Sequence, residues 1–349
     1  MKSILFCENN YAFGILDPIK QVLIEKGYDY IWYVTKKIIK DFPYSSDNYT
    51  SQISELETFN ADAIFVPGNA VPYYLRGLKV QVFHGMAGEK KGHFRIRQYF
   101  DLYLTQGPYF TNKFNELRDK HKDFDVIETG WPKLDIYGID KSKYIDYKKE
   151  LLKEFGAKKV ILYAPTFSPK LTSAPFLLKV IKALAKNQDY VILLKFHPLM
   201  APEWIEKYKI LADSIPNIYY KEEKNIVKFL LIADILISDT SSVVYEFMLL
   251  DKPVITFNSI SQHIYWENTK SFNDLIPLID KNLNKDPFAK SREYICKQYH
   301  PYSDGKSALR MVDATRGYIE QHGVPEKRKL SFLRRMKIHS LFGKPSKSS

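Results

Sequence analysis

The stretch Ala233–Phe257, ADILISDTSSVVYEFMLLDKPVITF, joins two short apolar runs through a polar turn and a helical pattern. The runs Ile235–Ile237 and Val254–Phe257 are too short for helices and are typical of buried strands. Between them, four hydroxyl groups and a carboxylate stand where the first strand gives way to apolar side chains at helical spacing. The stretch therefore predicts a strand–helix–strand unit of a parallel sheet.

The same alternation extends over most of the chain and occurs twice. Strands are predicted at 3–7, 30–34, 63–66, 80–83, 102–105 and 126–128, and then at 160–164, 190–196, 218–220, 235–237 and 254–257. A charged helical stretch at 139–159 separates the two series. We therefore expect two α/β domains with a cleft between them. The predicted divisions are an N-terminal domain at 1–145, a second domain at 146–320 and a tail at 321–349.

Composition fits a globular protein of a reducing compartment. The 349 residues are 45% hydrophobic and 26% charged, enough to bury two cores. Only two cysteines are present, Cys7 and Cys296, which argues against a disulfide framework or a zinc cluster. The first residues contain no apolar stretch of signal-peptide length, and no window approaches the roughly 18 apolar residues of a membrane-spanning helix. A cytoplasmic location is therefore expected.

The net charge of +12 is concentrated at the end of the chain. Residues 327–349 carry eight Lys and Arg and no acid, which leaves 44 bases against 40 acids, or +4, for the rest. Leu330, Leu333, Met336 and Leu341 are interspersed among these cations. A basic amphipathic segment is typical of binding to an anionic membrane surface. The alternative is a disordered tail that increases solubility.

The polar turn Ser238–Ser242 lies where a ligand is expected. Ligands of open parallel sheets bind beyond the carboxyl ends of the strands, and a helix that begins there directs unpaired N–H groups toward them. The Ser and Thr hydroxyls would add further donors, so the turn predicts an anion site suited to a phosphate. The alternative is ordinary helix capping, which needs only one such residue.

Two histidines also stand at predicted strand ends. His84 follows Val82–Phe83 and precedes Gly85, whose missing side chain permits a positive φ and close approach of a ligand. His197 follows the strand at 190–196. Because histidine can donate to a phosphate oxygen or transfer a proton near neutral pH, one on each side of a cleft would suit a transfer reaction. The alternative is a structural role for each.

Taken in order, six motifs resemble one known family. They are HG at 84–85, GWPKLD at 130–135, ILYAPT at 161–166, HP at 197–198, the stretch 233–257, and DGKS at 304–307 with Arg310. Together they span roughly residues 80–315 and are similar to the CDP-glycerol glycerophosphotransferases, the teichoic-acid primases and polymerases. The resemblance implies an α/β, GT-B-like fold, in which two Rossmann-like domains with parallel sheets face each other across a cleft.

The resemblance also implies a reaction. Glycerol phosphate, or a related polyol phosphate, would pass from a CDP-activated donor to a hydroxyl of a lipid-linked glycan or polyol-phosphate chain, with release of CMP. The product would be teichoic acid, capsule or O-antigen. The expected substrate is CDP-glycerol or another CDP-polyol, with no cofactor and no metal. The enzyme would be peripheral on the inner face of the cell membrane, held there by its basic tail.

By this resemblance, residues of both domains receive roles. His84 would be the general base on the acceptor hydroxyl, and His197 would act on the donor's diphosphate. The further donor-binding residues would be Ala164, Pro165, Thr166, Asp239, Thr240, Ser241, Ser242 and Asp251. Gly85, Lys90 and Lys91 would lie on the acceptor side. The family usually has Asp-Tyr-Ser-Ser where this chain has DTSS at 239–242, and the segment after His84 also departs, so the polyol stays open.

Two other functions compete with this interpretation. A GT-B sugar transferase that uses a nucleotide sugar would have the same fold, with Glu246 as a carboxylate that could grip ribose or sugar. A nucleic-acid binder would fit the positive charge and the aromatic content of 15%. However, the excess charge lies in the tail and no single-strand stacking motif is seen, so no nucleic-acid partner is expected.

Overall fold

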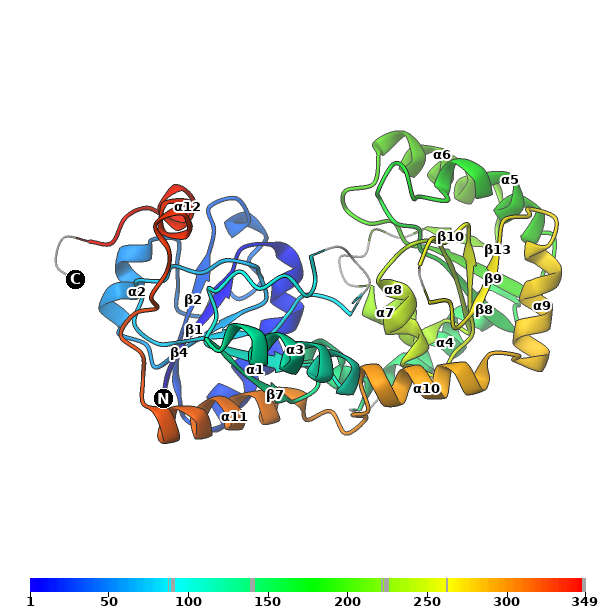
Figure 1. Cartoon of the computed structure of the whole chain (residues 1–349). Helices are drawn as coiled ribbons and strands as arrows, with labels where there is room; N and C mark the ends of the chain where they lie inside the picture. Colours follow the sequence, from blue (N-terminus) through cyan, green and yellow to red (C-terminus); the bar gives the residue numbers. More distant parts are fainter. Residues whose placement is uncertain are drawn as a thin grey trace. The chain divides into compact units, whose positions relative to one another are not determined.

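The computed structural model describes residues 1–86, 88, 92–138, 142–220, 222, 226–261 and 263–346. These residues form two compact units. The first unit contains Met1–Ile139 and Gln298–Ser349, and the second contains Asp140–Lys297. Each unit is built on one parallel sheet with helices packed against it (Figure 1).

The sheet of the first unit has strand order β3-β2-β1-β4-β5-β6-β7, and all neighbours are parallel. The strands are β1 (Lys2–Cys7), β2 (Asp29–Val34), β3 (Tyr49–Thr50), β4 (Ala63–Val66), β5 (Leu78–Gln81), β6 (Leu102–Thr105) and β7 (Asp125–Glu128). Its central strands are apolar on both faces because helices cover both. The strand order reverses between β1 and β4, which makes the carboxyl end of this pair a topological switch point.

Helices and short 3-10 turns connect these strands. The α-helices are α1 (Phe13–Glu25), α2 (Ile53–Phe59), α3 (Pro108–His121), α11 (Ser307–His322) and α12 (Phe332–Phe342). The 3-10 turns are η1 (Asn10–Ala12), η2 (Ile39–Asp41) and η3 (Pro132–Tyr137). Strand β5 ends two residues before the strand predicted at 80–83, because Phe83 has a φ of 59° and cannot continue an extended strand.

The chain returns to the first unit near residue 298, which differs from the predicted division at 320. Helix α11 begins where both carboxylate oxygens of Asp135 accept backbone N–H groups, from Ser307 and Ala308, each at 2.8 Å. It packs against α1, and Lys26 at the end of α1 forms an ion pair of 2.9 Å with Asp313. Residues 298–320 therefore complete the first unit and do not belong to the second.

The basic tail is folded against the first unit as far as residue 346. Arg328 donates to the Asp101 carboxylate and to the backbone carbonyl of Asp123. Helix α12 follows (Figure 1). Its Ile338 side chain is fully buried. A disordered tail is therefore not what these residues form. Among the described residues, no helix combines the length and the apolar character needed to cross a membrane.

The sheet of the second unit has strand order β10-β9-β8-β11-β12-β13, again with parallel neighbours. Its strands are β8 (Lys159–Tyr163), β9 (Tyr190–Leu194), β10 (Ile218–Tyr220), β11 (Ile235–Ser238), β12 (Val254–Phe257) and β13 (Glu267–Thr269). Its helices are α4 (Ser142–Phe155), α5 (Ala174–Leu184), α6 (Pro202–Ser214), α7 (Val227–Ile232), α8 (Val243–Met248), α9 (Leu275–Lys285) and α10 (Ala289–Tyr299). Here the order reverses between β8 and β11.

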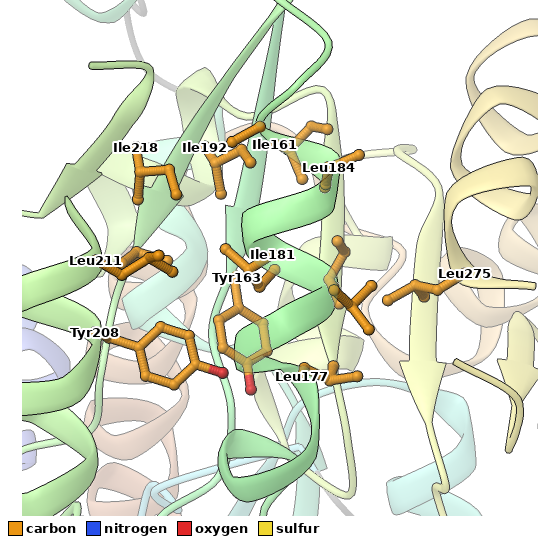
Figure 2. Packing of buried hydrophobic residues seen from close by; sticks show 14 of the residues in the cluster. Ile161, Tyr163, Leu177, Ile181, Leu184, Ile192, Tyr208, Leu211, Ile218 and Leu275 are labelled. Carbon is orange, nitrogen blue, oxygen red and sulfur yellow. The ribbon is translucent and has the colours of Figure 1, made fainter. Parts of the chain in front are cut away.

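A continuous apolar core fixes this second sheet. Figure 2 shows Leu177, Ile181 and Leu184 of α5 packed against side chains of β8 and β9. The Tyr163 ring at the end of β8 lies beside the Tyr208 ring of α6, with centroids 5.6 Å apart. The core therefore reaches the carboxyl ends of the strands and holds the turns that follow them.

Candidate functional site

The predicted donor-binding turns meet at the switch point of the second sheet. Strands β8 and β11 are neighbours, so the segments after them, 164–166 and 239–242, leave the same edge. The Ala164 N–H donates to the Ile237 carbonyl at 3.0 Å, and the Ser238 hydroxyl donates to the Ala164 carbonyl at 2.7 Å. The structure thus brings these two motifs together from positions more than 70 residues apart.

Asp239 holds this edge together from inside the fold. Its side chain is fully buried, and its carboxylate accepts the N–H of Thr166 at 2.9 Å. It also accepts the N–H and the hydroxyl of Ser173, both at 2.8 Å. Asp239 therefore positions the turn after β8 through bonds to Thr166 and Ser173.

The hydroxyl groups after Asp239 differ in their surroundings. Thr240 accepts the N–H of Ile260 at 3.1 Å and so ties down the segment after β12. Ser241 and Ser242 are partly exposed. Ser242 stands at the N-cap of α8 but makes no side-chain cap bond, and Ser241 accepts the N–H of Val243 only at 3.5 Å. Capping alone therefore does not account for the hydroxyl-rich turn.

His197 follows β9, which lies next to β8, and its side chain is exposed. Its Nδ1 accepts the backbone N–H of Leu199 at 3.1 Å. A backbone N–H can only donate, so in the neutral ring the proton is on Nε2. The Phe167 ring stacks on the imidazole with centroids 4.3 Å apart and fixes its orientation. His197 therefore presents an N–H donor at the same edge as Ser241.

Two other residues of the second unit are placed differently from this group. Asp251 lies between α8 and the start of β12, at the amino end of the strands, and its carboxylate pairs with Arg292 at 3.2 Å. The structure therefore places Asp251 at the opposite end of the sheet from Asp239 and Ser241. This position does not agree with the predicted donor-binding role of Asp251. Glu246 of α8, the carboxylate of the alternative sugar-transferase interpretation, is only 5% exposed.

His84 follows β5 in the first unit and is exposed. Its Nδ1 lies 2.9 Å from the Pro67 carbonyl oxygen. A carbonyl can only accept, so Nδ1 carries the proton, and in the neutral ring Nε2 has the lone pair. This is the tautomer that a general base requires. The preceding residue, Phe83, holds a φ of 59°, a strained conformation for a bulky side chain and one that clusters at functional sites.

The other acceptor-side predictions have mixed outcomes. Gly85 does not have the positive φ that the sequence suggested, since that conformation belongs to Phe83. A Cβ at Gly85 would meet nothing within 4 Å, so the space beside it is open. Lys90 and Lys91 lie outside the described residues.

The structure adds two residues that the sequence interpretation missed. Glu8 directly follows β1, and its carboxylate lies against Gly68, so close that a Cβ on Gly68 would be 2.1 Å from Oε2. The ring of Tyr11 lies 5.2 Å from that of His84. The signal was the polar run Glu8-Asn9-Asn10 directly after an apolar strand, which is the same pattern that identified His84 and His197.

The remaining two motifs, GWPKLD and DGKS, pack on each other within the first unit. Besides the bonds from Asp135 to the start of α11, the Arg310 guanidinium donates to the Thr129 carbonyl at 2.7 Å and pairs with Asp304 at 2.7 Å. Gly130 has a φ of 87°, and a Cβ there would lie 2.5 Å from the Ser307 hydroxyl. These motifs therefore join the returning chain to the first sheet.

The sequence is similar to those of known proteins. A family model described as CDP-Glycerol:Poly(glycerophosphate) glycerophosphotransferase matches residues 25–316. The chain is 26% identical over 272 residues to the teichoic acid ribitol-phosphate polymerase TarL of Staphylococcus aureus, a match that covers 67% of this chain and 46% of that protein. It is 28% identical over 232 residues to a teichoic acid glycerol-phosphate primase of Bacillus spizizenii, covering 61% and 57%. The chain thus spans about half the length of the curated relatives it matches.

The fold is also similar to that of a solved structure, the wall teichoic acid polymerase TagF. The TM-score is 0.67 at 18% identity, and the match covers 91% of this chain and 89% of that one. The predicted fold class, α/β and GT-B-like with two Rossmann-like units, is confirmed. Since the family model covers most of the sequence, the chain belongs to the CDP-glycerol:poly(glycerophosphate) glycerophosphotransferase family.

Proposed function

We propose that the chain transfers glycerol phosphate, or a related polyol phosphate, from a CDP-activated donor to a hydroxyl group and releases CMP. The acceptor is a lipid-linked glycan or a polyol-phosphate chain, and the polymer is a teichoic acid. Family membership supports the reaction class, and the names of both relatives point to teichoic acid. A variant of TagF that was solved after a soak in CDPG supports the donor class.

The observation that carries the proposal is the opposite tautomer of the two histidines. The Pro67 carbonyl fixes His84 with a lone pair on Nε2, and the Leu199 N–H fixes His197 with a proton on Nε2. One ring is thus prepared to accept a proton from an attacking hydroxyl. The other is prepared to donate to a phosphate oxygen. A transfer from a diphosphate to an alcohol needs both.

In the proposed reaction, the acceptor oxygen attacks the phosphorus that carries the polyol. The bond from that phosphorus to the bridging oxygen breaks, and the bridging oxygen leaves on CMP. The hydroxyl proton passes to Nε2 of His84. Phosphoryl transfer depends on positioning and charge stabilisation, which His197, Ser241 and Ser242 would supply to the phosphate oxygens.

We also propose that the enzyme is peripheral on the inner face of an anionic membrane, through the outer side of α12. Four large apolar side chains of this helix are exposed: Phe332 by 66%, Leu333 by 80%, Met336 by 48% and Leu341 by 54%. Exposed cations surround them, at Lys327, Lys329, Arg335, Lys337 and Lys344. An apolar face ringed by Lys and Arg matches a surface of anionic lipid. A lipid-linked acceptor would lie at that surface.

The first experiment measures which nucleotide is released. Purified protein is incubated with CDP-glycerol, CDP-ribitol or a nucleotide sugar, together with lipid-linked disaccharide or polyol-phosphate acceptors. We expect CMP from one CDP-polyol, and a loss of about 10²–10⁴ in rate for His84→Ala. The matched control is His121→Ala, since His121 is an exposed histidine at the end of α3. Release of UDP or GDP from a sugar donor would overturn the proposal.

A further inference from the structure

A second polar group stands beside His84 at the switch point of the first sheet. Glu8 follows β1, and Pro67 and Gly68 follow β4, so all three leave the edge where the strand order reverses. His84 donates to the Pro67 carbonyl, and the Glu8 carboxylate lies over the next residue, Gly68. The two side chains thus contact consecutive residues of one turn. This is where a ligand of an open parallel sheet is expected.

The Glu8 side chain is half-buried. Its carboxylate oxygens form no hydrogen bond or ion pair with another described residue; only its backbone carbonyl accepts a bond, from the Thr35 hydroxyl. Burial raises the pKa of Glu8 to about 7 because nothing offsets the loss of water. Groups with a pKa raised in this way cluster at functional sites, and Glu8 stands at a strand end where a ligand of a parallel sheet is expected. Glu8 also lies outside the residues that the family model matches.

Tyr11 lies next to His84 and is the third residue of this group. Its ring lies 5.2 Å from the His84 ring, and the side chain is 44% exposed. The Asn9 amide donates to the Tyr11 hydroxyl at 3.4 Å, which helps to hold the ring in place. A half-exposed aromatic ring beside a carboxylate suits a ligand that presents C–H groups to the ring and hydroxyls to the oxygens.

We propose that Glu8, Tyr11 and His84 form a subsite for an acceptor that ends in two neighbouring hydroxyl groups. His84 takes the proton of the attacking hydroxyl, and Glu8 accepts a hydrogen bond from the adjacent one. This inference rests on the proposed function and specifies its acceptor. A carboxylate repels phosphate, so Glu8 favours a neutral polyol or sugar end and disfavours an acceptor that ends in a phosphate group.

The test compares two acceptors that differ by one hydroxyl. One ends in glycerol phosphate, with two neighbouring free hydroxyls, and the other ends in 1,3-propanediol phosphate and keeps only the terminal hydroxyl. A hydrogen bond to a charged group accounts for a preference of about 10- to 100-fold. We expect the full-length protein to prefer the diol acceptor by that factor in kcat/KM. We expect Glu8→Ala to lose the preference, with its KM for the CDP donor unchanged.

A second variant moves the carboxylate without removing it. Gly68 does not have a positive φ, and a Cβ there meets only the flexible Glu8 side chain. Gly68→Ala should therefore fold and should also weaken the diol preference. Its matched control is Gly14→Ala, where a Cβ meets nothing within 4 Å. The control for Glu8→Ala is Glu25→Ala, an exposed acid at the end of α1.

The outcomes separate this inference from the proposed function. If the unmodified protein releases CMP but shows the same diol preference with and without Glu8, the subsite is wrong and the function stands. If no acceptor is used, binding of glycerol phosphate is measured by ligand-observed NMR for the unmodified protein and Glu8→Ala. Equal binding, or none to either protein, would refute the subsite. Weaker binding by Glu8→Ala would support it, although the proposed transfer had failed.

Discussion

At the scale of single residues, a backbone partner decides what each histidine can do. His84 and His197 both follow strands of parallel sheets, and the sequence around them does not distinguish their roles. The difference comes from one contact each: a carbonyl acceptor at Pro67 and an N–H donor at Leu199. Because the contacts are opposite, Nε2 has the lone pair in the neutral His84 ring and carries the proton in the neutral His197 ring.

This difference predicts opposite responses to amide substitution. The amide nitrogen of Gln can replace Nε2–H as a donor, so His197→Gln should recover part of the roughly 10²–10³-fold loss expected for His197→Ala. The amide nitrogen of Asn can replace Nδ1–H toward Pro67, but Asn provides no base. His84→Asn should therefore be as inactive as His84→Ala. The measurement is kcat for CMP release; equal recovery in both series would contradict the assigned tautomers.

Glu8 predicts a dependence of stability on pH. Its pKa is raised from its ordinary value of 4.5 to about 7, so between these values the folded chain holds a proton that the unfolded chain has released. Below about pH 4.5 the carboxyl is neutral in both states, so its burial lowers the free energy of unfolding very little. As the pH rises toward about 7, ionisation stabilises the unfolded chain and the free energy of unfolding falls. Glu8→Gln should then increase the free energy of unfolding at pH 8 by about 1–3 kcal/mol.

The same substitution should have a much smaller effect at pH 5, because this is close to the ordinary pKa of 4.5 and the unfolded chain has gained little free energy from ionisation there. Urea unfolding at both pH values measures the difference, and Glu25→Gln is the control because its exposed carboxylate has no such burial. A benefit of equal size at pH 5 and pH 8 would show that Glu8 is not the titrating group.

At the scale of elements, Arg328 makes the most buried polar contacts between the end of the chain and the first sheet. Arg328 pairs with Asp101 at the start of β6 and also donates to the Asp123 carbonyl, and its side chain is only 9% exposed. Arg328→Ala should release the segment that leads into α12. We expect faster amide exchange over residues 324–342, with little change in β6. Lys329→Ala, at an exposed neighbour, should leave exchange as it is. Protection retained in Arg328→Ala would mean that the other contacts of α12, such as Tyr73 with His339 and Arg334 with Gln98, hold the helix without Arg328.

The elements themselves were largely predictable, and their partnerships were not. Buried strands such as β9 and β11 are short apolar runs, so local pattern was sufficient to find them. Strand β13 was missed because its residues, Glu267–Thr269, are polar and pair only through backbone. Asp239 and Asp251 flank the same helix, α8, but they lie at opposite ends of the sheet. Only the three-dimensional arrangement separates these two roles.

At the scale of the whole molecule, the sequence predicted two α/β units but not where the second one ends. The boundary depends on contacts between residues far apart, such as Asp135 with the start of α11 and Lys26 with Asp313. Local pattern contains no information on such pairs. The same limit applies to Glu8, which becomes notable only when β1 and β4 are seen to be neighbours.

At the scale of the whole molecule, the distribution of charge also bears on the proposed membrane association. The net charge is +12, and the last 23 residues hold eight of its cations. Arg328 and Arg334 are turned inward, to Asp101 and Gln98, so the exposed cations of α12 and its flanks are what a lipid surface would meet. Each basic residue near an anionic surface contributes about 1 kcal/mol, and salt screens this attraction.

We therefore expect the protein to sediment with vesicles that contain phosphatidylglycerol at low salt, and to be released at about 0.5 M salt, where charges are screened beyond a few ångströms. The double variant Leu333→Ser with Met336→Ser should lower partitioning by about tenfold or more, since these side chains would enter the interface. Ile210→Ser is the matched control, because Ile210 is 59% exposed on α6. Equal retention of all three proteins, or binding to neutral vesicles that salt does not change, would assign the exposed face of α12 another role.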